Sequence, residues 1–244
     1  MRWILGAIVL VLAGCALTRE AETDYAAERN DMILSIEETA KLAGRRTGIP
    51  RFDERVLRAM AAVPRHQFVP EPLRPLAYAE TPLPLGFGQN LSMPFITALV
   101  TDLLDIKPGD VVLETGTDSG YQAAVFAEMG ATVYSIEIIE PLHKAAGRLL
   151  SEQHRSNIFL RLGDGFFGWP EAGPFDAILI KEGLDELPAP LLNQLRRGGR
   201  MILPLGPANG AQQLTLIEKT MDGRIRQRSI MPVRFAPMQG GERI

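Results

Sequence analysis

Residues Glu114 to Gln122 read ETGTDSGYQ and join a short apolar strand to a helix. Glycines in such a turn let the backbone approach a ligand closely, and the start of the helix offers free N–H groups. A tight connection that binds nothing would contain the same glycines. The next strand, Thr132 to Ile138, completes a βαβ unit, and Glu137 lies 21 residues after Gly116. Nucleotide-binding α/β folds place an acid for ribose hydroxyls at about that spacing, so this unit predicts a nucleotide-like ligand.

Outward from this unit, the chain after Pro94 alternates helices with short apolar strands, which is typical of a sheet covered by helices. The segment Phe175 to Ile180 is almost wholly apolar, as expected for a parallel strand that is buried on both faces. The sequence therefore predicts an α/β fold, a doubly wound and mostly parallel sheet with helices on both faces. The expected helices span residues 95–104, 121–129, 141–152 and 187–195, and the expected strands span residues 110–114, 132–138, 158–162, 175–180, 200–204, 213–218 and 230–235.

The part of the domain before this core is helical and then rich in proline. Helices are expected from about Met32 to Gly44 and from Asp53 to Ala62. Between Val63 and Pro94 seven prolines break helices and leave loops and short strands. Long ordered loops often carry function. We therefore interpret residues 31–94 as a substrate segment and residues 95–244 as a cofactor-binding core.

Composition limits the class of protein. The 244 residues are 46% hydrophobic and carry a formal net charge of −3, as in ordinary globular proteins. One cysteine excludes an intramolecular disulfide, and three scattered histidines lack the spacing of metal ligands, so no metal site is predicted. Without a run of Lys or Arg, nucleic acid is not an expected partner. The length suits one domain, which we expect to be a monomer.

The first residues look like an export signal. Met1-Arg2 is followed by the apolar run Trp3 to Leu12 and then by Ala13-Gly14-Cys15. This order resembles the lipobox of bacterial lipoproteins, in which the cysteine becomes the acylated first residue. An uncleaved anchor is the alternative, but the apolar stretch is shorter than the roughly 20 residues of a spanning helix. The sequence thus predicts a signal peptide at 1–14, lipidation at Cys15, a polar tether at 15–30, and a lipid anchor on the periplasmic side of the cell envelope.

A set of motifs in the domain resembles those of protein-L-isoaspartate O-methyltransferases. The turn ETGTDSGYQ looks like their S-adenosylmethionine motif, and the resemblance covers about residues 31–238. A collinear set of this size is far more specific than any single motif. The other matching segments, in order, are Val63 to His66 with Phe68 to Pro70, Pro82 to Gly86, Gly88-Gln89, Ser92-x-Pro94, Gly163 to Gly165 with Gly168-Trp169, and Pro232 to Phe235 with Pro237-Met238.

This resemblance implies a Rossmann-like class I methyltransferase fold and a protein-repair reaction. The methyl group of S-adenosylmethionine would pass to the free carboxylate of an L-isoaspartyl residue in a damaged protein or peptide. Because a carboxylate is already ionised near neutral pH, alignment and electrostatics can replace most of the work of a general base. The partners implied are isoaspartyl-containing proteins or peptides.

The resemblance also implies the residues of the site. Ser92 is expected to donate a hydrogen bond to the substrate carboxylate, although its position also suits a helix N-cap. Glu137 is expected at the ribose hydroxyls and Asp164, in the Gly163 to Gly165 turn, at the adenine amino group. The implied cofactor-binding residues are Glu114, Gly116, Thr117, Ser119, Gly120, Tyr121, Glu137, Asp164 and Gly165, and the implied substrate-binding residues are Gln89, Pro94, Val233, Arg234 and Phe235.

Three departures from the family pattern flank the expected site. Asp118 stands where the family has glycine. If its φ is positive the residue is strained, and its charge would lie near the methionine carboxylate of the cofactor, so weaker cofactor binding is expected. Asn90 stands where the family commonly has threonine, and Lys181-Glu182-Gly183 replace a small Thr-Ala-Ala-like turn. Such a charged pair could alter substrate choice or end methyl transfer.

Two functions therefore stay open. The chain is either a working isoaspartyl methyltransferase, in the envelope or, with the N-terminus misread, in the cytoplasm, or a non-catalytic envelope lipoprotein that keeps the fold as a peptide- or ligand-binding module. Retained motif residues favour the enzyme, namely Ser92, Gly116, Gly120, Glu137, Asp164 and Arg234. Asp118, the Lys181-Glu182 turn and the export signal favour the second function. The export signal does so because S-adenosylmethionine is made and held in the cytoplasm. Binding of S-adenosylhomocysteine distinguishes the two.

Overall fold

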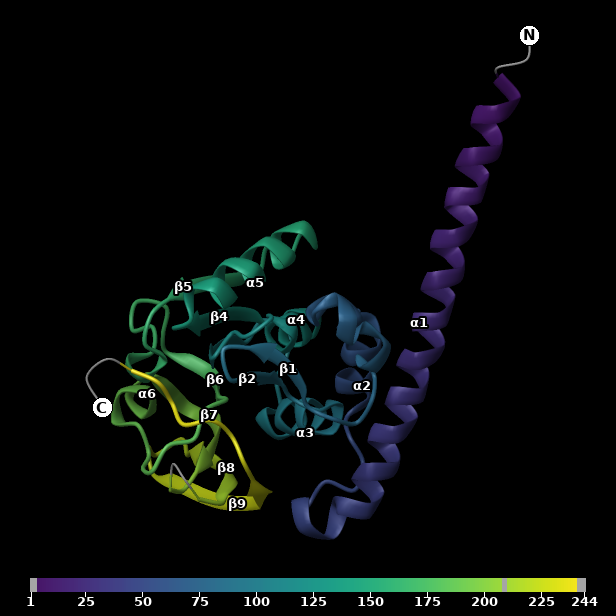
Figure 1. The fold of residues 1–244 in the computed structure, drawn as a ribbon. Coiled ribbons are helices and arrows are strands. Elements are labelled where there is room, and N and C mark those ends of the chain that lie inside the picture. Colours follow the sequence, from purple (N-terminus) through teal and green to yellow (C-terminus); the bar gives the residue numbers. More distant parts are fainter. Residues whose placement is uncertain (1–3, 208–209, 241–244) are drawn as a thin grey trace.

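Figure 1 shows a twisted sheet flanked by helices, in a computed structural model that describes residues 4–207 and 210–240. The sheet has seven strands in the order β5-β4-β3-β6-β7-β8-β9. The first five strands in that order are parallel, whereas β8 and β9 are each antiparallel to the strand before them. The strands are β3 (Val111–Thr115), β4 (Thr132–Glu137), β5 (Ile158–Leu162), β6 (Phe175–Ile180), β7 (Leu195–Leu205), β8 (Gln212–Lys219) and β9 (Ile225–Val233).

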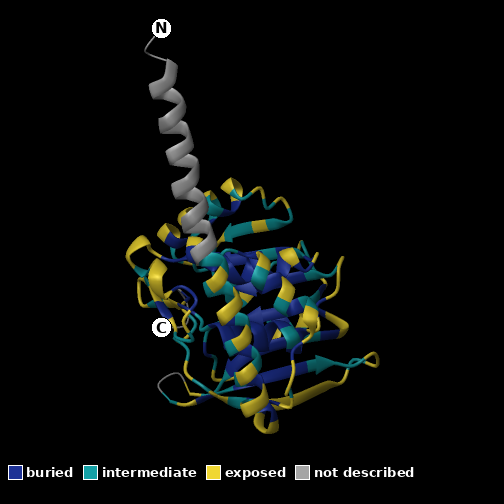
Figure 2. Cartoon of the chain, turned by 90° about the vertical axis from the view of Figure 1, so that its right-hand side faces the viewer, coloured by how far each residue is buried: buried dark blue, intermediate teal, exposed yellow. Residues whose placement is uncertain are grey.

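Helices cover both faces of this sheet, as the sequence predicts. Successive side chains of a strand point to opposite faces. Val112 therefore belongs to the core on the side of α1 to α5, and Leu113 to the core under α6 and the loop around Trp169. Figure 2 shows the buried strands enclosed between helices with exposed outer surfaces. The helices are α1 (Ile4–Thr47), α2 (Glu54–Ala62), α3 (Pro94–Leu104), α4 (Tyr121–Glu128), α5 (Glu140–Glu152) and α6 (Ala189–Gln194).

The last strand differs from its expected bounds. β9 begins at Ile225 rather than Ile230, because residues 225–229 also pair with β8. These five residues are exposed and mostly polar, so they have no apolar pattern that would indicate a strand. β9 ends at Val233, so the predicted substrate residues Arg234 and Phe235 lie in the loop that follows. That loop turns back toward the carboxyl edge of the parallel strands, where Pro237 forms a bridge with Gly183.

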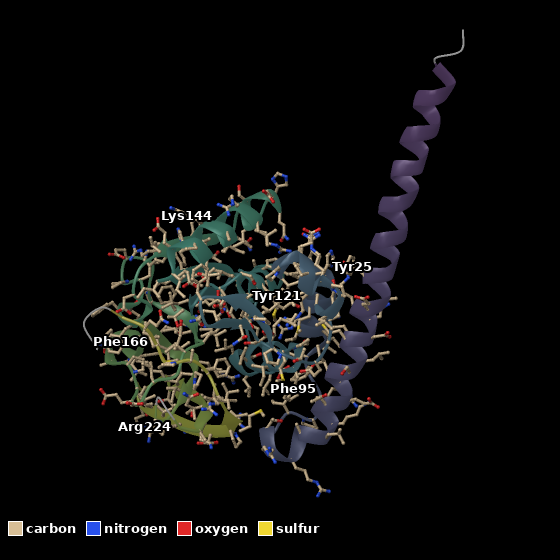
Figure 3. The ribbon with its side chains drawn as sticks, in the orientation of Figure 1. Tyr25, Phe95, Tyr121, Lys144, Phe166 and Arg224 are labelled. Carbon is tan, nitrogen blue, oxygen red and sulfur yellow. The ribbon has the colours of Figure 1, made fainter. Side chains whose placement is uncertain are left out.

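Residues 15–30, which the sequence assigns to a polar tether, are part of helix α1. Residues 26–29 (AAER) are strong helix formers. The ring of Tyr25 stacks on that of His66, with centroids 3.9 Å apart and planes 3° apart, so α1 packs on the domain at this point. Figure 3 shows Tyr25 on the side of α1 that faces the domain. The tether itself stays a prediction.

The structure does not test the predicted signal peptide or the lipidation of Cys15. The side chains of residues 1–24, Cys15 included, are not described by the structure. Within the residues it does describe, no helix combines the length and apolar character needed to cross a membrane.

The proline-rich segment is held to the core by the fully buried Arg65. Its Nε donates to the carbonyl oxygen of Ala77 at 2.7 Å and its Nη2 to that of Ser92 at 2.6 Å. The guanidinium also lies 4.8 Å from the centre of the Tyr121 ring. Arg65 thereby fixes the backbone of Ser92 against the start of α4. The short elements of this segment are two 3₁₀ turns (Arg65–Phe68 and Glu71–Leu76) and the hairpin β1 (Leu83–Gly86) and β2 (Gln89–Leu91).

Candidate active site

The candidate site lies at the carboxyl edge of β3 and β6. The strand order reverses between these two neighbours, and ligands of open α/β sheets bind at such a switch point. The turn after β3 carries three positive φ angles, 67° at Gly116, 54° at Asp118 and 88° at Gly120. Asp118 therefore has the left-handed conformation that the sequence analysis considered. An L-residue other than glycine is strained there.

Glu137, at the end of β4, orders this turn. Its Oε2 accepts a hydrogen bond from the backbone N–H of Asp118, and its Oε1 accepts one from that of Ile139, both at 2.8 Å. Burial raises the pKa of Glu137, while these two hydrogen bonds lower it in part. The carboxylate is thus fixed at the place where the sequence predicts a ribose contact.

A narrow cavity of about 20 Å³ runs beside Glu137. The predicted residues Gly116, Glu137 and Gly165 line it together with Gln89, which was predicted on the substrate side. The last part of the lining comes from a loop far along the chain, namely Pro237, Met238 and Gln239. Pro237 and Met238 belong to a segment that resembles the family motifs but were not predicted as site residues, and Gln239 had no signal in the sequence.

Glu182 explains why this cavity is narrow. Its side chain lies across Gly116, so that a Cβ added to this glycine would meet Oε1 at 2.5 Å. Oε2 accepts a hydrogen bond from the Thr115 hydroxyl at 2.6 Å. Burial raises the pKa of Glu182 to about 7, although the Thr115 hydrogen bond works against this shift. The carboxyl group of Glu182 therefore occupies the space next to Gly116.

Lys181, the preceding residue, turns toward the other side of the glycine turn. Its Nζ lies 3.0 Å from Oε1 of Glu114 and 2.9 Å from Oδ2 of Asp118. Burial works to lower the pKa of Lys181, but the carboxylates of Asp118 and Glu114 outweigh it and raise the pKa. Two of the departures from the family pattern, at 118 and at 181, thus form one ion pair.

The carboxylate of Glu114 lies beneath the glycine turn, and its side chain is 0% exposed. Its Oε2 accepts a hydrogen bond from the Ser135 hydroxyl at 2.7 Å, and Ser135 Oγ lies 2.7 Å from the Thr117 hydroxyl. Buried charges are tolerated when they are paired and hydrogen-bonded in this way. The network joins β3, β4 and the end of β6 under the glycine turn.

A larger cavity of about 300 Å³ adjoins the narrow one. It brings together the predicted Ser92, Gln89, Val233, Arg234 and Phe235. Asp118 and Gln89 line both cavities. Lys181 lines this larger cavity, whereas Glu182 lines the narrow one.

The loop after β9 completes both cavities, and Gly183 holds it. The N–H of Gly183 donates to the carbonyl oxygen of Ala236 at 2.8 Å, and the N–H of Met238 donates to that of Gly183 at 3.0 Å. The amide of Gln212 adds hydrogen bonds to both backbone groups of Phe235. The predicted substrate residues of this loop therefore sit on a fixed backbone.

Besides Glu114 of the buried network, several predicted residues have side chains that line neither cavity. Tyr121 is 1% exposed and packs edge-on against Phe68 in the middle of the domain (Figure 3). The Thr117 hydroxyl bonds Ser135, and Asp164 accepts a hydrogen bond from the N–H of Phe166 at 2.9 Å. Pro94 is buried as the first residue of α3. The backbone of these residues shapes the turns, while their side chains support the fold.

The N-cap role considered for Ser92 is wrong. The N-cap of α3 is Met93, whose own side chain makes no capping hydrogen bond. Instead, Oε1 of Glu80 accepts a hydrogen bond from the N–H of Phe95 at 2.8 Å. A carboxylate can serve the first turn of a helix from a distant loop, which the sequence does not reveal. The Ser92 side chain is thereby left to the larger cavity.

Comparison with known proteins identifies the family. A family model described as protein-L-isoaspartate(D-aspartate) O-methyltransferase matches residues 39–243. The chain belongs to this family. It is 46% identical over 234 residues to protein-L-isoaspartate O-methyltransferase 2 of Syntrophobacter fumaroxidans, which covers 96% of this chain and 95% of the relative. It is 51% identical over 194 residues to a protein of the same name from Polaromonas sp. (strain JS666), covering 80% of this chain and 92% of that one.

Solved structures agree on the fold. A protein-L-isoaspartate O-methyltransferase superposes with a TM-score of 0.74 at 24% identity, over 87% of this chain and 66% of the solved one. A structure described as a putative protein-L-isoaspartate O-methyltransferase from Plasmodium falciparum, in complex with S-adenosyl-L-homocysteine, gives a TM-score of 0.68 at 24% identity over 83% and 98% of the chains. Together with the family membership, these likenesses confirm the predicted Rossmann-like methyltransferase fold and S-adenosylmethionine as its cofactor.

Proposed function

We propose that this protein-L-isoaspartate O-methyltransferase transfers a methyl group from S-adenosylmethionine to the carboxylate of isoaspartyl residues in damaged proteins or peptides. The observation that carries the proposal is the contact between its two cavities. The narrow cavity at the glycine turn and the larger one at Ser92 share Gln89 and Asp118 in their walls. A methyl donor in the first and an acceptor in the second would meet at these residues.

The residues of the narrow cavity suit the cofactor. Glu137 presents a fixed acceptor for hydroxyl groups, and Gly116 leaves room that a Cβ would fill. The carboxylate of Glu137 is also an anionic group beside the place of a cationic ligand. When bound, S-adenosylmethionine supplies an electrophilic methyl group on a positively charged sulfur. Glu182 has to leave its place over Gly116 for a ligand of that size to enter.

The larger cavity suits an acceptor that needs no base. Its described lining contains no histidine, and an isoaspartyl carboxylate needs none because it is already ionised. We assign Ser92 the task of donating a hydrogen bond to one carboxylate oxygen, which orients the other as the nucleophile. Orientation of this kind can lower the activation free energy of a reaction by several kcal/mol. Val233, Arg234 and Phe235 would contact the peptide on either side.

Two assays on the purified full-length chain test this function. We expect methylation of a peptide with one L-isoaspartyl residue, no methylation of its aspartyl counterpart, and a strong loss in Ser92→Ala. Calorimetry should show that the parent and Ser92→Ala both bind S-adenosylhomocysteine. A chain that neither binds S-adenosylhomocysteine nor methylates the peptide would instead be the non-catalytic binding module.

We further propose that the protein acts in the cell envelope, anchored on the periplasmic side by a lipid on Cys15. The support is the order of Arg2, the apolar run from Trp3 and the small residues before Cys15. A location in the cytoplasm is the alternative, and it would place the enzyme beside its cofactor supply. The chain is proposed to act as a monomer.

A further inference from the structure

Lys181 stands between the cofactor turn and the substrate cavity. Its ammonium has three N–H donors. The carboxylates of Glu114 and Asp118, at 3.0 and 2.9 Å, account for two of them. The same side chain lines the cavity that contains Ser92, and 14% of it is exposed there. The third donor is therefore available to a group in this cavity.

The two carboxylates also hold the ammonium in place. Glu114 is fixed from below by the Ser135 hydroxyl, and Asp118 by the hydrogen bond from its N–H to Glu137. Both carboxylates raise the pKa of Lys181, so the cation persists throughout the physiological range. A positioned and permanently charged donor is what recognition of an anionic group requires.

The larger cavity has few other cations that could bind a substrate carboxylate. Among the described residues that line it, the only other cation is Arg234, which is exposed at the rim. Ser92 and Lys181 also line a second, small cavity together, and Arg234 does not line it. We therefore take Lys181 rather than Arg234 as the cation for a carboxylate at Ser92.

We propose that Lys181 is a substrate-positioning residue, whose ammonium receives the isoaspartyl carboxylate beside Ser92. The Lys181-Glu182-Gly183 turn is then an alternative way to hold the acceptor, in place of the small turn common in the family. The inference rests on the proposed location of the substrate carboxylate at Ser92. It makes Asp118 the partner that aims Lys181, not a defect in the glycine turn.

The test compares two peptides that differ in one group. One contains an L-isoaspartyl residue, and in the other its free carboxylate is replaced by a carboxamide of the same shape. Binding of each is measured by calorimetry in the presence of saturating S-adenosylhomocysteine. A charge-assisted hydrogen bond corresponds to a difference of about tenfold or more in affinity, so the parent should prefer the carboxylate by at least that factor.

Variants isolate the contribution of Lys181. Lys181→Met alone leaves two buried carboxylates unpaired and can fail to fold. In Asp118→Asn/Lys181→Met only Glu114 loses its cation, and it keeps the hydrogen bond from Ser135. The decisive pair is therefore Asp118→Asn against this double variant, provided that the double variant binds S-adenosylhomocysteine. We expect the single variant to keep most of the preference for the carboxylate and the double variant to lose it, with unchanged affinity for the carboxamide. Lys181→Arg should retain the preference.

The outcomes distinguish a failure of the Lys181 assignment from a failure of the proposed substrate position at Ser92. Loss of the preference only when Lys181 is removed supports the assignment. A double variant that folds, binds S-adenosylhomocysteine and still prefers the carboxylate as the parent does would overturn it. A parent without any preference would overturn both this inference and the proposed location of the substrate at Ser92.

Discussion

The ammonium of Lys181 lies 2.9 Å from the carboxylate of Asp118, and each side chain is less than 15% exposed. A pair this deeply buried is costly to break, because the remaining charge has lost both water and partner. The strained residue of the glycine turn is therefore tied to the end of β6.

Removal of Lys181 should destabilise the fold more than removal of the Asp118 charge. Lys181→Met leaves Glu114 and Asp118 unpaired, which should cost about 3–5 kcal/mol of unfolding free energy. Asp118→Asn leaves Lys181 paired with Glu114 and should cost about 1–2 kcal/mol. Urea unfolding of both single variants and the double variant gives the coupling energy, expected at about 1–3 kcal/mol. Additive effects would mean that the two side chains do not interact in solution.

Neutralising Asp118 should not tighten cofactor binding. The sequence analysis expects repulsion between this charge and the methionine carboxylate, but Lys181 compensates the charge in the structure. Asp118→Asn should therefore change the dissociation constant of S-adenosylhomocysteine by less than about threefold, which is within 0.7 kcal/mol. Calorimetry decides the matter, and a tenfold gain in affinity would restore the repulsion argument.

Glu182 should make the fold less stable as the pH rises. Its folded pKa of about 7 exceeds its ordinary value of 4.5, so the folded state binds the extra proton. Stability is therefore lost between pH 4.5 and 7, by up to roughly 3 kcal/mol. Glu182→Gln should be more stable than the parent at pH 8 and equal to it near pH 4.5. Glu186→Gln, at an exposed position, is the control, and identical pH profiles for parent and Glu182→Gln would contradict the shift.

Glu137→Ala should weaken binding of S-adenosylhomocysteine by about 10- to 150-fold, the equivalent of roughly 1.5–3 kcal/mol. The substitution removes the proposed acceptor for the ribose hydroxyls and the acceptor of two backbone N–H groups. Because the second loss also loosens the turn, Glu137→Gln serves as a comparison that keeps one acceptor oxygen. An unchanged dissociation constant in Glu137→Ala would remove this residue from the cofactor site.

Expression in a bacterial host should give a membrane-associated, acylated protein. Cys15→Ser should abolish acylation and leave the precursor uncut at this site. Fractionation with mass spectrometry of the N-terminal peptide measures both effects. Unprocessed wild-type protein in the cytosol would argue for the cytoplasmic alternative.

Strand and turn positions could be predicted because their causes are local. The apolar run of β6 and the glycines after β3 identify themselves by composition. Side-chain partners that come from distant segments could not. Nothing near Glu80 indicates that it caps α3, and only the folded chain brings Lys181 to Asp118. The stacking of Tyr25 on His66, which is far along the chain, could not be predicted for the same reason.

The loop after β9 links the two cavities mechanically. Residues 234–239 supply a wall to each cavity, and the backbone of Gly183 holds this loop through two hydrogen bonds. Displacement of the loop from Gly183 would therefore open the cofactor cavity and the substrate cavity together. A single proteolytic cut after Val233 would remove a wall from each cavity at once, leaving a folded but inactive body.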